Sequence, residues 1–355
     1  MKKGKVILIL VLIVCSLLLL VACGTTATEE TGTADYHYDL QPASWQEVGF
    51  WADQITYWSE YVTEHTEGRV TASPSLPGAI VPVDQQMDAV STGTTGAMAV
   101  PSAYYASTIP IGYVFCTPPV VQGVEDLRDF YENYQDGRAG QLWEQAVEAK
   151  YNVKVIGEMY GLACVPICSS KSIPNIDALK GLKIRVGAGA IADTLGSFGA
   201  SCVFAPSSEA YSMLSAGTID GVVTGSPSDM LGASFNEVTQ YWVKDPYLNT
   251  THCTTLVINK DIWDALTAED QQVLIDALAY SNEKVTAESK AAIDTAWETA
   301  EADGLTIQSW PQEDQVAWAT AFYNSNANYK GADADYTEFM TLLHSWAVEK
   351  GYMTE

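Results

Sequence analysis

One arginine stands inside an otherwise apolar stretch of this chain. Residues 180–190 read KGLKIRVGAGA, and Arg185 has aliphatic neighbours on both sides and no adjacent carboxylate. Alternation along a strand places Arg185 on one face with Lys183 and Gly187, close to the carboxyl end where open α/β sheets bind ligands. A buried guanidinium needs an anionic partner, because an unpaired buried charge is costly. The partner is either an internal Asp or Glu or a ligand carboxylate, which the planar fork of arginine holds bidentately.

The remaining charges do not offer a second site of this kind. An acidic residue lies within two positions of each of the other arginines, Arg69, Arg128 and Arg138, so these three are interpreted as solvated and locally neutralised. The whole chain has 18 basic and 44 acidic residues, for a formal net charge of -26. Such an excess of negative charge argues against nucleic acid and acidic lipid headgroups as partners. A small anion would need a local positive site, and Arg185 is the candidate.

The N-terminus carries an export pattern. Three lysines within the first five residues precede the apolar run VILILVLIVCSLLLL, and LVAC then places Cys23 at the expected cleavage point. This resembles a bacterial lipobox, which implies a signal peptide over 1–22, a lipidated Cys23 and a polar tether over 23–34. An ordinary signal peptide or an uncleaved anchor is the alternative. The prediction is an extracytoplasmic protein that is lipid-anchored to the outer face of the cytoplasmic membrane.

Strand and helix patterns alternate along the rest of the chain. Strands are expected at 153–160, 179–186, 201–206, 219–225 and 254–260, with helices between them. Apolar residues at spacings of three and four predict a helix over 45–66 with Ser44 as its N-cap. Only helices are expected after residue 260, including a long one over 268–304. The order indicates an α/β fold with mostly parallel sheets.

Five cysteines remain beyond the N-terminal segment, at positions 116, 164, 168, 202 and 253. An odd number in an exported chain leaves at least one thiol unpaired. Apolar or small neighbours favour buried, unreactive thiols. Cys164 and Cys168 lack a second Cys or His pair at zinc spacing, so a structural zinc site is not expected.

The segment ALKGLKIRVGAGAIADTLGSFGASCVFAPSSEAYSMLSAGTIDGVV resembles the signature region of solute-binding proteins of tripartite ATP-independent periplasmic (TRAP) transporters, the DctP type. The resemblance extends over about residues 36–330. It implies two lobes with a ligand cleft between them and a long helix bridging both. The expected division is 35–161 plus 251–290 for lobe I and 162–250 plus 291–355 for lobe II. The matching positions within the signature are Glu209, Tyr211, Leu214, Gly217, Asp220 and Gly221.

The resemblance also implies a binding site. The arginine of the K-I-R strand in this family pairs with a ligand carboxylate, and that role carries over to Arg185. The family's acidic metal-binding position is occupied here by Val223-Thr224, so no metal and no cofactor are expected. Cys164 or Val165 stands where many members have a second polar contact. For the other candidates, ligand contact and ordinary packing both remain open: Thr224, Ser207, Asn249, Tyr104, Tyr105 and Cys164.

The predicted function is therefore capture of a small organic-acid anion and its delivery to TRAP membrane permease subunits, with no catalysis. The aromatic residues Trp45, Tyr104, Tyr105, Tyr160 and Tyr247 permit a larger or aromatic acid. One alternative is the binding protein of an ABC-type importer or a sensor. Another is a dinucleotide-binding enzyme, suggested by the weak G-x-G-x-x-A pattern over 187–192. No G-x-S-x-G or H-E-x-x-H motif supports a hydrolase, and His252 is expected to form a structural hydrogen bond.

Overall fold

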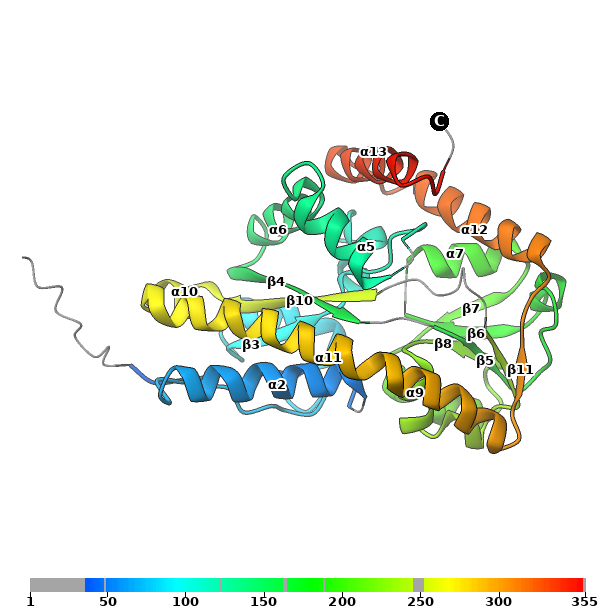
Figure 1. Cartoon of the computed structure of the whole chain (residues 1–355), viewed down its shortest axis with the longest axis horizontal. Helices are drawn as coiled ribbons and strands as arrows, with labels where there is room; N and C mark the ends of the chain where they lie inside the picture. The colour runs from blue at the N-terminus through cyan, green and yellow to red at the C-terminus, as the bar shows by residue number, and fades with distance from the viewer. Residues whose placement is uncertain are drawn as a thin grey trace, which may run out of the picture. The chain divides into compact units, whose positions relative to one another are not determined.

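The computed structural model describes residues 36–47, 49–121, 123–161, 165–187, 189–244 and 252–353. The predicted signal peptide, the tether and Cys23 lie outside these residues. The described strands form a two-stranded pair, a three-stranded sheet and a six-stranded sheet. Figure 1 shows the three-stranded and six-stranded sheets with helices packed around them. No helix of the described ranges is both long and apolar enough to cross a membrane.

The three-stranded sheet is antiparallel and has the order β3-β10-β4. Its strands are Ala97–Val100 (β3), Val153–Gly161 (β4) and His252–Asn259 (β10). All four residues of β3 are buried, as are seven of the eight in β10, which is typical of strands covered on both faces. The parallel pair β1-β2 and the helices around this part of the chain are β1 (Tyr38–Asp39), β2 (Val70–Thr71), α2 (Phe50–His65), α3 (Gln86–Ser91), α4 (Gly112–Phe115), α5 (Val124–Arg128) and α6 (Arg138–Glu148).

The six-stranded sheet has the order β11-β9-β5-β8-β6-β7 and is mostly parallel, as expected. Three of its neighbouring pairs are parallel, and β5 runs antiparallel to both β8 and β9. The strands are β5 (Ile167–Ser169), β6 (Lys183–Val186), β7 (Ser201–Phe204), β8 (Gly221–Val223), β9 (Tyr241–Val243) and β11 (Thr306–Gln308), and the helices α7 (Ala190–Ser197), α8 (Ala210–Ser215), α9 (Pro227–Gly232) and α12 (Gln312–Ala327) accompany them.

The expectation of only helices after residue 260 is wrong. Strand β11, Thr306–Gln308, pairs with β9 in parallel at the edge of the six-stranded sheet. Three residues are too few to produce a periodic pattern in the sequence. They form a strand because the neighbouring strand offers unpaired backbone groups. The short strands β5 and β9 were not expected for the same reason.

A single long helix runs from the part of the chain around the three-stranded sheet to the part around the six-stranded sheet. Helix α11 covers Ala268–Ala302 and begins at Thr267, whose side chain accepts a hydrogen bond from the Asp270 backbone N–H. Near its start, the Trp58 Nε1 group of α2 donates to the Leu274 carbonyl oxygen at 3.1 Å. Near its end, Trp297 packs in the apolar cluster of the six-stranded sheet. Its 35 residues span about 50 Å at 1.5 Å per residue, enough to contact both parts (Figure 1).

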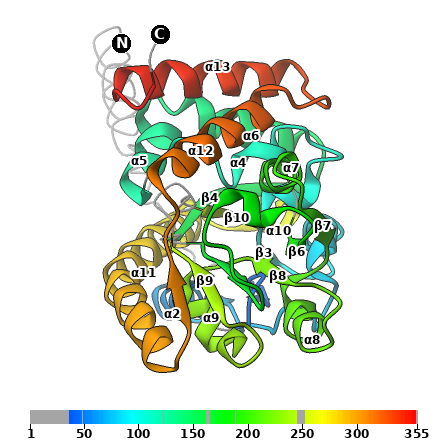
Figure 2. The same cartoon turned by 90° about the vertical axis from the view of Figure 1, so that its right-hand side faces the viewer.

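The C-terminal helix α13, Ala334–Glu349, belongs to the core of the three-stranded sheet. Phe339 and Trp346 of α13 pack in the same cluster as Phe115 and Phe130. Figures 1 and 2 both show α13 above α5 and α6 and on the side opposite α2. The predicted lobe boundaries stay a prediction, and this packing does not favour placing all of 291–355 in lobe II.

The first long helix begins later than the sequence pattern indicates. Helix α2 starts at Phe50, and Gly49, with φ 82° and ψ -171°, precedes it without a side-chain cap. The prediction of Ser44 as the N-cap is wrong, because its hydroxyl donates to the Gln46 carbonyl oxygen in a local turn. Trp45 consequently lies outside the helix, and its environment differs from the helical one that was expected for it.

Glu158 is a buried carboxyl group in the core beside β10. The Thr255 hydroxyl donates to it at 2.9 Å, and the Trp143 Nε1 group donates to that hydroxyl at 2.7 Å. Burial raises the pKa of Glu158 from its ordinary value of 4.5 to about 8. The folded chain therefore keeps a proton at Glu158 that the unfolded chain has already lost between these two values.

Stability is expected to fall as the pH rises through this window. Between about pH 4.5 and 8 the folded state binds more protons at Glu158 than the unfolded state, so the free energy of unfolding decreases with pH, by up to about 1 kcal/mol per pH unit. Glu158→Gln removes the titration and should be more stable than the wild type at pH 8, with a smaller difference at pH 5. Urea unfolding at both pH values measures this, with Glu60→Gln on the surface of α2 as the control. An equal difference at both pH values would contradict a neutral Glu158.

Candidate functional site

A cavity of about 80 Å³ lies where the ends of several elements meet. The carboxyl ends of β6 and β8 contribute to its wall, as do the start of β10 and the start of α2. Both larger sheets therefore take part in it. Residues from parts of the chain that are distant in sequence lie together in the lining, which includes Trp45, Phe50, Trp51, Arg185, Thr224 and His252.

Arg185 is the charged group of this cavity. It lies on β6, between β7 and β8, and its side chain is 1% exposed. Its Nε donates to the Ala205 carbonyl oxygen at 2.7 Å, and its Nη1 donates to the Val223 carbonyl oxygen at 3.4 Å. These carbonyl groups stand at the carboxyl ends of the two neighbouring strands, so the sheet itself orients the guanidinium. The third nitrogen, Nη2, is buried and has no hydrogen-bond partner within the described part of the chain.

The other three arginines all form ion pairs with carboxylates. Arg128 and Arg138 pair with Glu132 and Glu338, as expected for solvated charges. The interpretation of Arg69 as a solvated charge is wrong: it contacts the fully buried Asp270 through two nitrogens, at 2.7 and 3.1 Å. Among residues 36–353 that the structure describes, no ion pair is found for Arg185.

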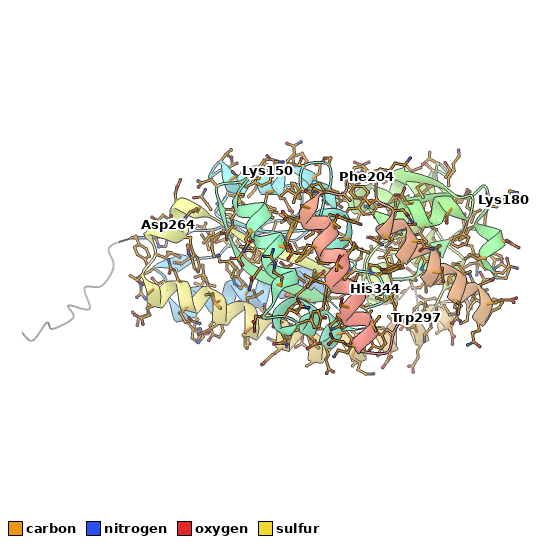
Figure 3. All side chains as sticks on the ribbon, turned by 90° about the horizontal axis from the view of Figure 1, so that it is seen from above. Lys150, Lys180, Phe204, Asp264, Trp297 and His344 are labelled. Carbon is orange, nitrogen blue, oxygen red and sulfur yellow. The ribbon has the colours of Figure 1, made fainter. Side chains whose placement is uncertain are left out.

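The buried surroundings of Arg185 make its positive charge energetically unfavourable. Burial lowers the pKa of Arg185, while the nearby Tyr104 hydroxyl and the Glu209 carboxylate act in the opposite direction. Burial also raises the pKa of Tyr104, so its hydroxyl remains protonated at neutral pH. The ring of Tyr104 meets that of Phe204 edge to face at 6.0 Å, and Phe204, labelled in Figure 3, is 55% exposed. Tyr104 thus contacts the end of β7 from the side of the three-stranded sheet.

Aromatic rings form part of the cavity wall. Trp51 lies 5.2 Å from the ring of His252 and 4.6 Å from the ring of Phe50, centroid to centroid. The ring of Trp45 lies 5.9 Å from that of Trp51. Gly161 pairs with His252 across the sheet, and a Cβ at this position would approach Phe50 Cε2 to 2.4 Å. Glycine is therefore required at position 161 for the rings to pack on the strand.

Four buried polar atoms of the lining residues have no hydrogen-bond partner among the described residues. Native proteins pair the large majority of such atoms, with protein groups or with ordered water. Burial lowers the pKa of His252 to about 4, so its ring is neutral at pH 7 and retains one donor and one acceptor nitrogen. The cavity thus offers hydrogen-bonding positions to a bound molecule: Trp45 Nε1, Arg185 Nη2, Thr224 Oγ1 and His252 Nδ1.

Asp229 joins the wall of the cavity to the start of α2. Its carboxylate accepts hydrogen bonds from the backbone N–H and the hydroxyl of Ser226, at 2.7 and 2.8 Å, as part of the capping box of α9. Asp229 Oδ1 lies against Gly49, where an added Cβ would approach it to 1.9 Å, and no hydrogen-bond partner is found for this oxygen among the described residues. Burial raises the pKa of Asp229 to about 7. One side chain therefore links α9 of the six-stranded sheet region to α2.

The structure brings together only some of the residues singled out from the sequence. Arg185, Thr224 and Tyr104 line the cavity. Tyr105 does not line it; its hydroxyl accepts from the Met87 backbone N–H at 2.9 Å in the core. Ser207 lies in a short 3₁₀ helix, also outside the lining. Cys164 and Asn249 lie outside the described residues.

Sequence reasoning missed the aromatic side of the site. The sequence pattern placed Trp51 on the apolar face of a helix and predicted a structural hydrogen bond for His252, and it gave Phe50 no role. His252 instead lines the cavity, and no partner is found for its Nδ1 in the described ranges. The closeness of Trp45 and Trp51 in the sequence was the signal available for this aromatic cluster. It could be interpreted only once the helix was known to start at Phe50, which leaves Trp45 outside the helix.

Two further expectations concern the chemistry of cysteines and metals. Cys116, Cys168 and Cys253 are buried free thiols, and Cys202 is partly exposed and free. Within the described ranges no group of three or more His, Cys, Asp or Glu residues is placed to hold a metal ion. Absence of a metal and of a cofactor stays a prediction.

Comparison with known proteins identifies the family. Residues 44–331 match the sequence family described as bacterial extracellular solute-binding protein, family 7 (DctP). The chain belongs to this family. It is thus a DctP-type solute-binding protein of the TRAP transporter class, as the signature segment indicated.

Two relatives illustrate the similarity. A monocarboxylate 2-oxoacid-binding periplasmic protein of Nostoc sp. is 25% identical over 271 residues, which is 74% of this chain and 73% of the relative. The C4-dicarboxylate-binding periplasmic protein of Rhodobacter capsulatus is 23% identical over 265 residues, 73% of this chain and 76% of the relative. Both are named as binding proteins.

A solved structure shows the same fold. The TRAP periplasmic solute-binding protein of Desulfovibrio salexigens, with bound orotic acid, superposes with a TM-score of 0.78 at 20% identity, covering 88% of this chain and 99% of that one. The α/β, two-lobed binding-protein fold with a long bridging helix is therefore confirmed. DctP-type proteins act outside the cytoplasm, which agrees with the predicted compartment.

Proposed function

We propose that this DctP-type protein captures a small organic acid by binding its carboxylate to Arg185. The observation that supports this most strongly is a guanidinium that is 1% exposed, lines a cavity and forms no ion pair in the described part of the chain. Burial of this charge without a partner is unfavourable in free energy, and a bound anion would offset that cost. The relatives are named for 2-oxoacids and C4-dicarboxylates, and the Desulfovibrio structure holds orotic acid.

Thr224 would assist Arg185. Its hydroxyl is 7% exposed and has no described partner, and it follows Val223, whose carbonyl accepts from the guanidinium. A carboxylate has two oxygens with room for several hydrogen bonds, so one arginine fork and one hydroxyl suit it. Tyr104 would close the site from the side of the three-stranded sheet.

The proposal extends to the transport cycle. Because both larger sheets contribute to the cavity, a ligand held there stabilises the state in which the two lobes are closed. The closed, loaded form would then deliver the acid to TRAP permease subunits, and the protein itself would catalyse nothing.

Lipid on Cys23 would keep the protein at the outer face of the membrane. Cys23→Ser should therefore be lost from the membrane fraction, which fractionation of cells measures. Unchanged retention of the variant would contradict the lipid anchor.

A thermal-shift screen of organic acids tests the binding proposal. At 100 times its Kd a ligand stabilises the folded protein by about 2.7 kcal/mol, so at least one carboxylic acid should raise the Tm by several degrees. The primary amide of the same acid has the same shape without the charge and should leave the Tm unchanged. Stabilisation by amides or neutral solutes, with none by acids, would contradict the carboxylate site.

A further inference from the structure

We infer that the ligand is a monocarboxylate with a flat, apolar, single-ring body and one neutral hydrogen-bonding group. This inference rests on the proposed carboxylate site at Arg185 and adds the class of acid to it. The ring would lie along the aromatic wall formed by Trp45, Phe50, Trp51 and His252, and the neutral group would meet the Trp45 and His252 nitrogens.

The charge of the cavity limits the ligand to one carboxylate. Arg185 is the sole Lys or Arg among its described lining residues, and His252 is neutral at pH 7. The segments outside the described ranges between 36 and 353 contain no Lys or Arg in their sequence, so they cannot add a second cation. A second buried carboxylate would remain unpaired, which is unfavourable. Dicarboxylates are therefore expected to bind poorly.

The shape of the cavity favours a ring. The ring of Trp51 lies near those of Phe50 and His252, at centroid distances of 4.6 and 5.2 Å. Aromatic pairs gain attraction beyond the area that they bury, in tilted and edge-to-face arrangements such as these. Val165, Ile191 and Val223 add apolar surface to the lining. The cavity volume of about 80 Å³ is far below the roughly 300 Å³ of the smallest pockets for drug-sized ligands, so acids with two or more rings are not expected to bind.

The polar atoms away from Arg185 call for one neutral group. Trp45 Nε1 is a donor, its side chain is 7% exposed, and it has no partner in the described ranges. His252 Nδ1 is likewise without a described partner, and the two rings lie 5.6 Å apart, centroid to centroid. A hydroxyl, carbonyl or ring nitrogen on the ligand would satisfy one or both. A sugar acid would bury several hydroxyls against a wall that offers few polar atoms, so it fits less well.

Calorimetric titration of the purified protein with a panel of acids tests the inference. The probes are benzoate, the three hydroxybenzoates, pyruvate, succinate and galacturonate. We expect the aromatic monocarboxylates to bind most tightly and succinate to bind at least about 30-fold more weakly. Trp51→Ala should weaken the aromatic acids by about tenfold while changing pyruvate less. Trp263→Ala, which alters a half-buried tryptophan of helix α10 (Lys260–Ala265) outside the cavity, should leave every affinity unchanged.

Trp45→Phe tests the neutral hydrogen-bonding group of the ligand separately from its ring. It keeps an aromatic ring and removes the Nε1 donor, so at least one hydroxybenzoate should lose about fivefold in affinity while benzoate does not. Equal losses for benzoate and all hydroxybenzoates would overturn the assignment of that group. Preferred binding of succinate or galacturonate that still requires Arg185 would overturn the inference and leave the proposed function intact. Binding of no acid on the panel, or equal binding by Arg185→Ala, would remove both.

Discussion

Arg185→Ala should abolish binding of the acid that stabilises the wild type most. Truncation of one partner of a buried charge pair costs about 2 to 5 kcal/mol, which corresponds to roughly 30-fold to several-thousand-fold in affinity. The effect should be at the upper end, because the described lining has no second cation to take over. Unfolding should remain cooperative, since the guanidinium contributes no described ion pair to the folded state. Calorimetric titration and thermal unfolding of both proteins measure the two quantities.

Two further variants separate charge from geometry. Arg185→Lys keeps the charge but loses the planar fork and the contacts to Ala205 and Val223, so its affinity should be intermediate. Arg138→Ala removes a surface arginine that pairs with Glu338 and should leave affinity unchanged. If Arg185→Ala bound the acid as tightly as the wild type, the carboxylate site would have to be sought elsewhere.

Gly49→Ala should cause a large loss of stability near the site. Gly49 has φ 82° and ψ -171°, a region that is essentially restricted to glycine and costs other residues about 1–3 kcal/mol. In addition, the new Cβ would lie 1.9 Å from Asp229 Oδ1, so the carboxylate would have to move and its hydrogen bonds with Ser226 would be disturbed. We expect a combined loss of about 3 kcal/mol or more in the free energy of unfolding. Weaker acid binding should accompany it, because Phe50 and Trp51 begin this helix.

Gly68→Ala is the matched control at the other end of α2. Gly68 also has a positive φ, 78°, but a Cβ there would meet nothing within 4 Å. Its loss should be about 1–2 kcal/mol, with ligand affinity unchanged. In Gly49→Ala/Asp229→Ala the clash is relieved, so the combined loss should be smaller than the sum of the single losses. Equal losses in Gly49→Ala and Gly68→Ala would show that the contact with Asp229 is unimportant. Urea unfolding of the four variants provides these values.

The cavity combines a costly charge with several unsatisfied hydrogen-bonding atoms. Arg185 Nη2, Thr224 Oγ1, Trp45 Nε1 and His252 Nδ1 are buried without described partners. Each lowers the stability of the empty protein and becomes favourable when a ligand pairs with it. The free energy gained when a ligand pairs with these atoms favours the ligand-bound state over the empty state. A protein that captures a ligand requires this preference.

The local features of the site could be predicted from the sequence. An arginine between aliphatic residues on a short strand, followed by glycines, was sufficient to place Arg185 at the carboxyl end of β6, because strand alternation is a local property. The signature segment gave the family and the α/β fold, and the long helix over 268–304 was predicted within two residues of its end. These inferences depend on contacts between residues close in sequence or on a pattern carried by one continuous segment.

The composition of the cavity was decided only by tertiary structure. Trp45, Trp51 and His252 meet because β10 returns beside β4, where Gly161 leaves room for the rings, and because α2 starts at Phe50, next to Asp229 of a distant helix. The same long-range pairing created β11 from three residues without a periodic pattern. Tyr105 and Ser207 lie outside the cavity lining for a related reason, since neighbours far along the chain determine which side chains reach the cavity. Sequence periodicity reports on a residue's own element, whereas a binding cavity is formed by the approach of several elements to one another.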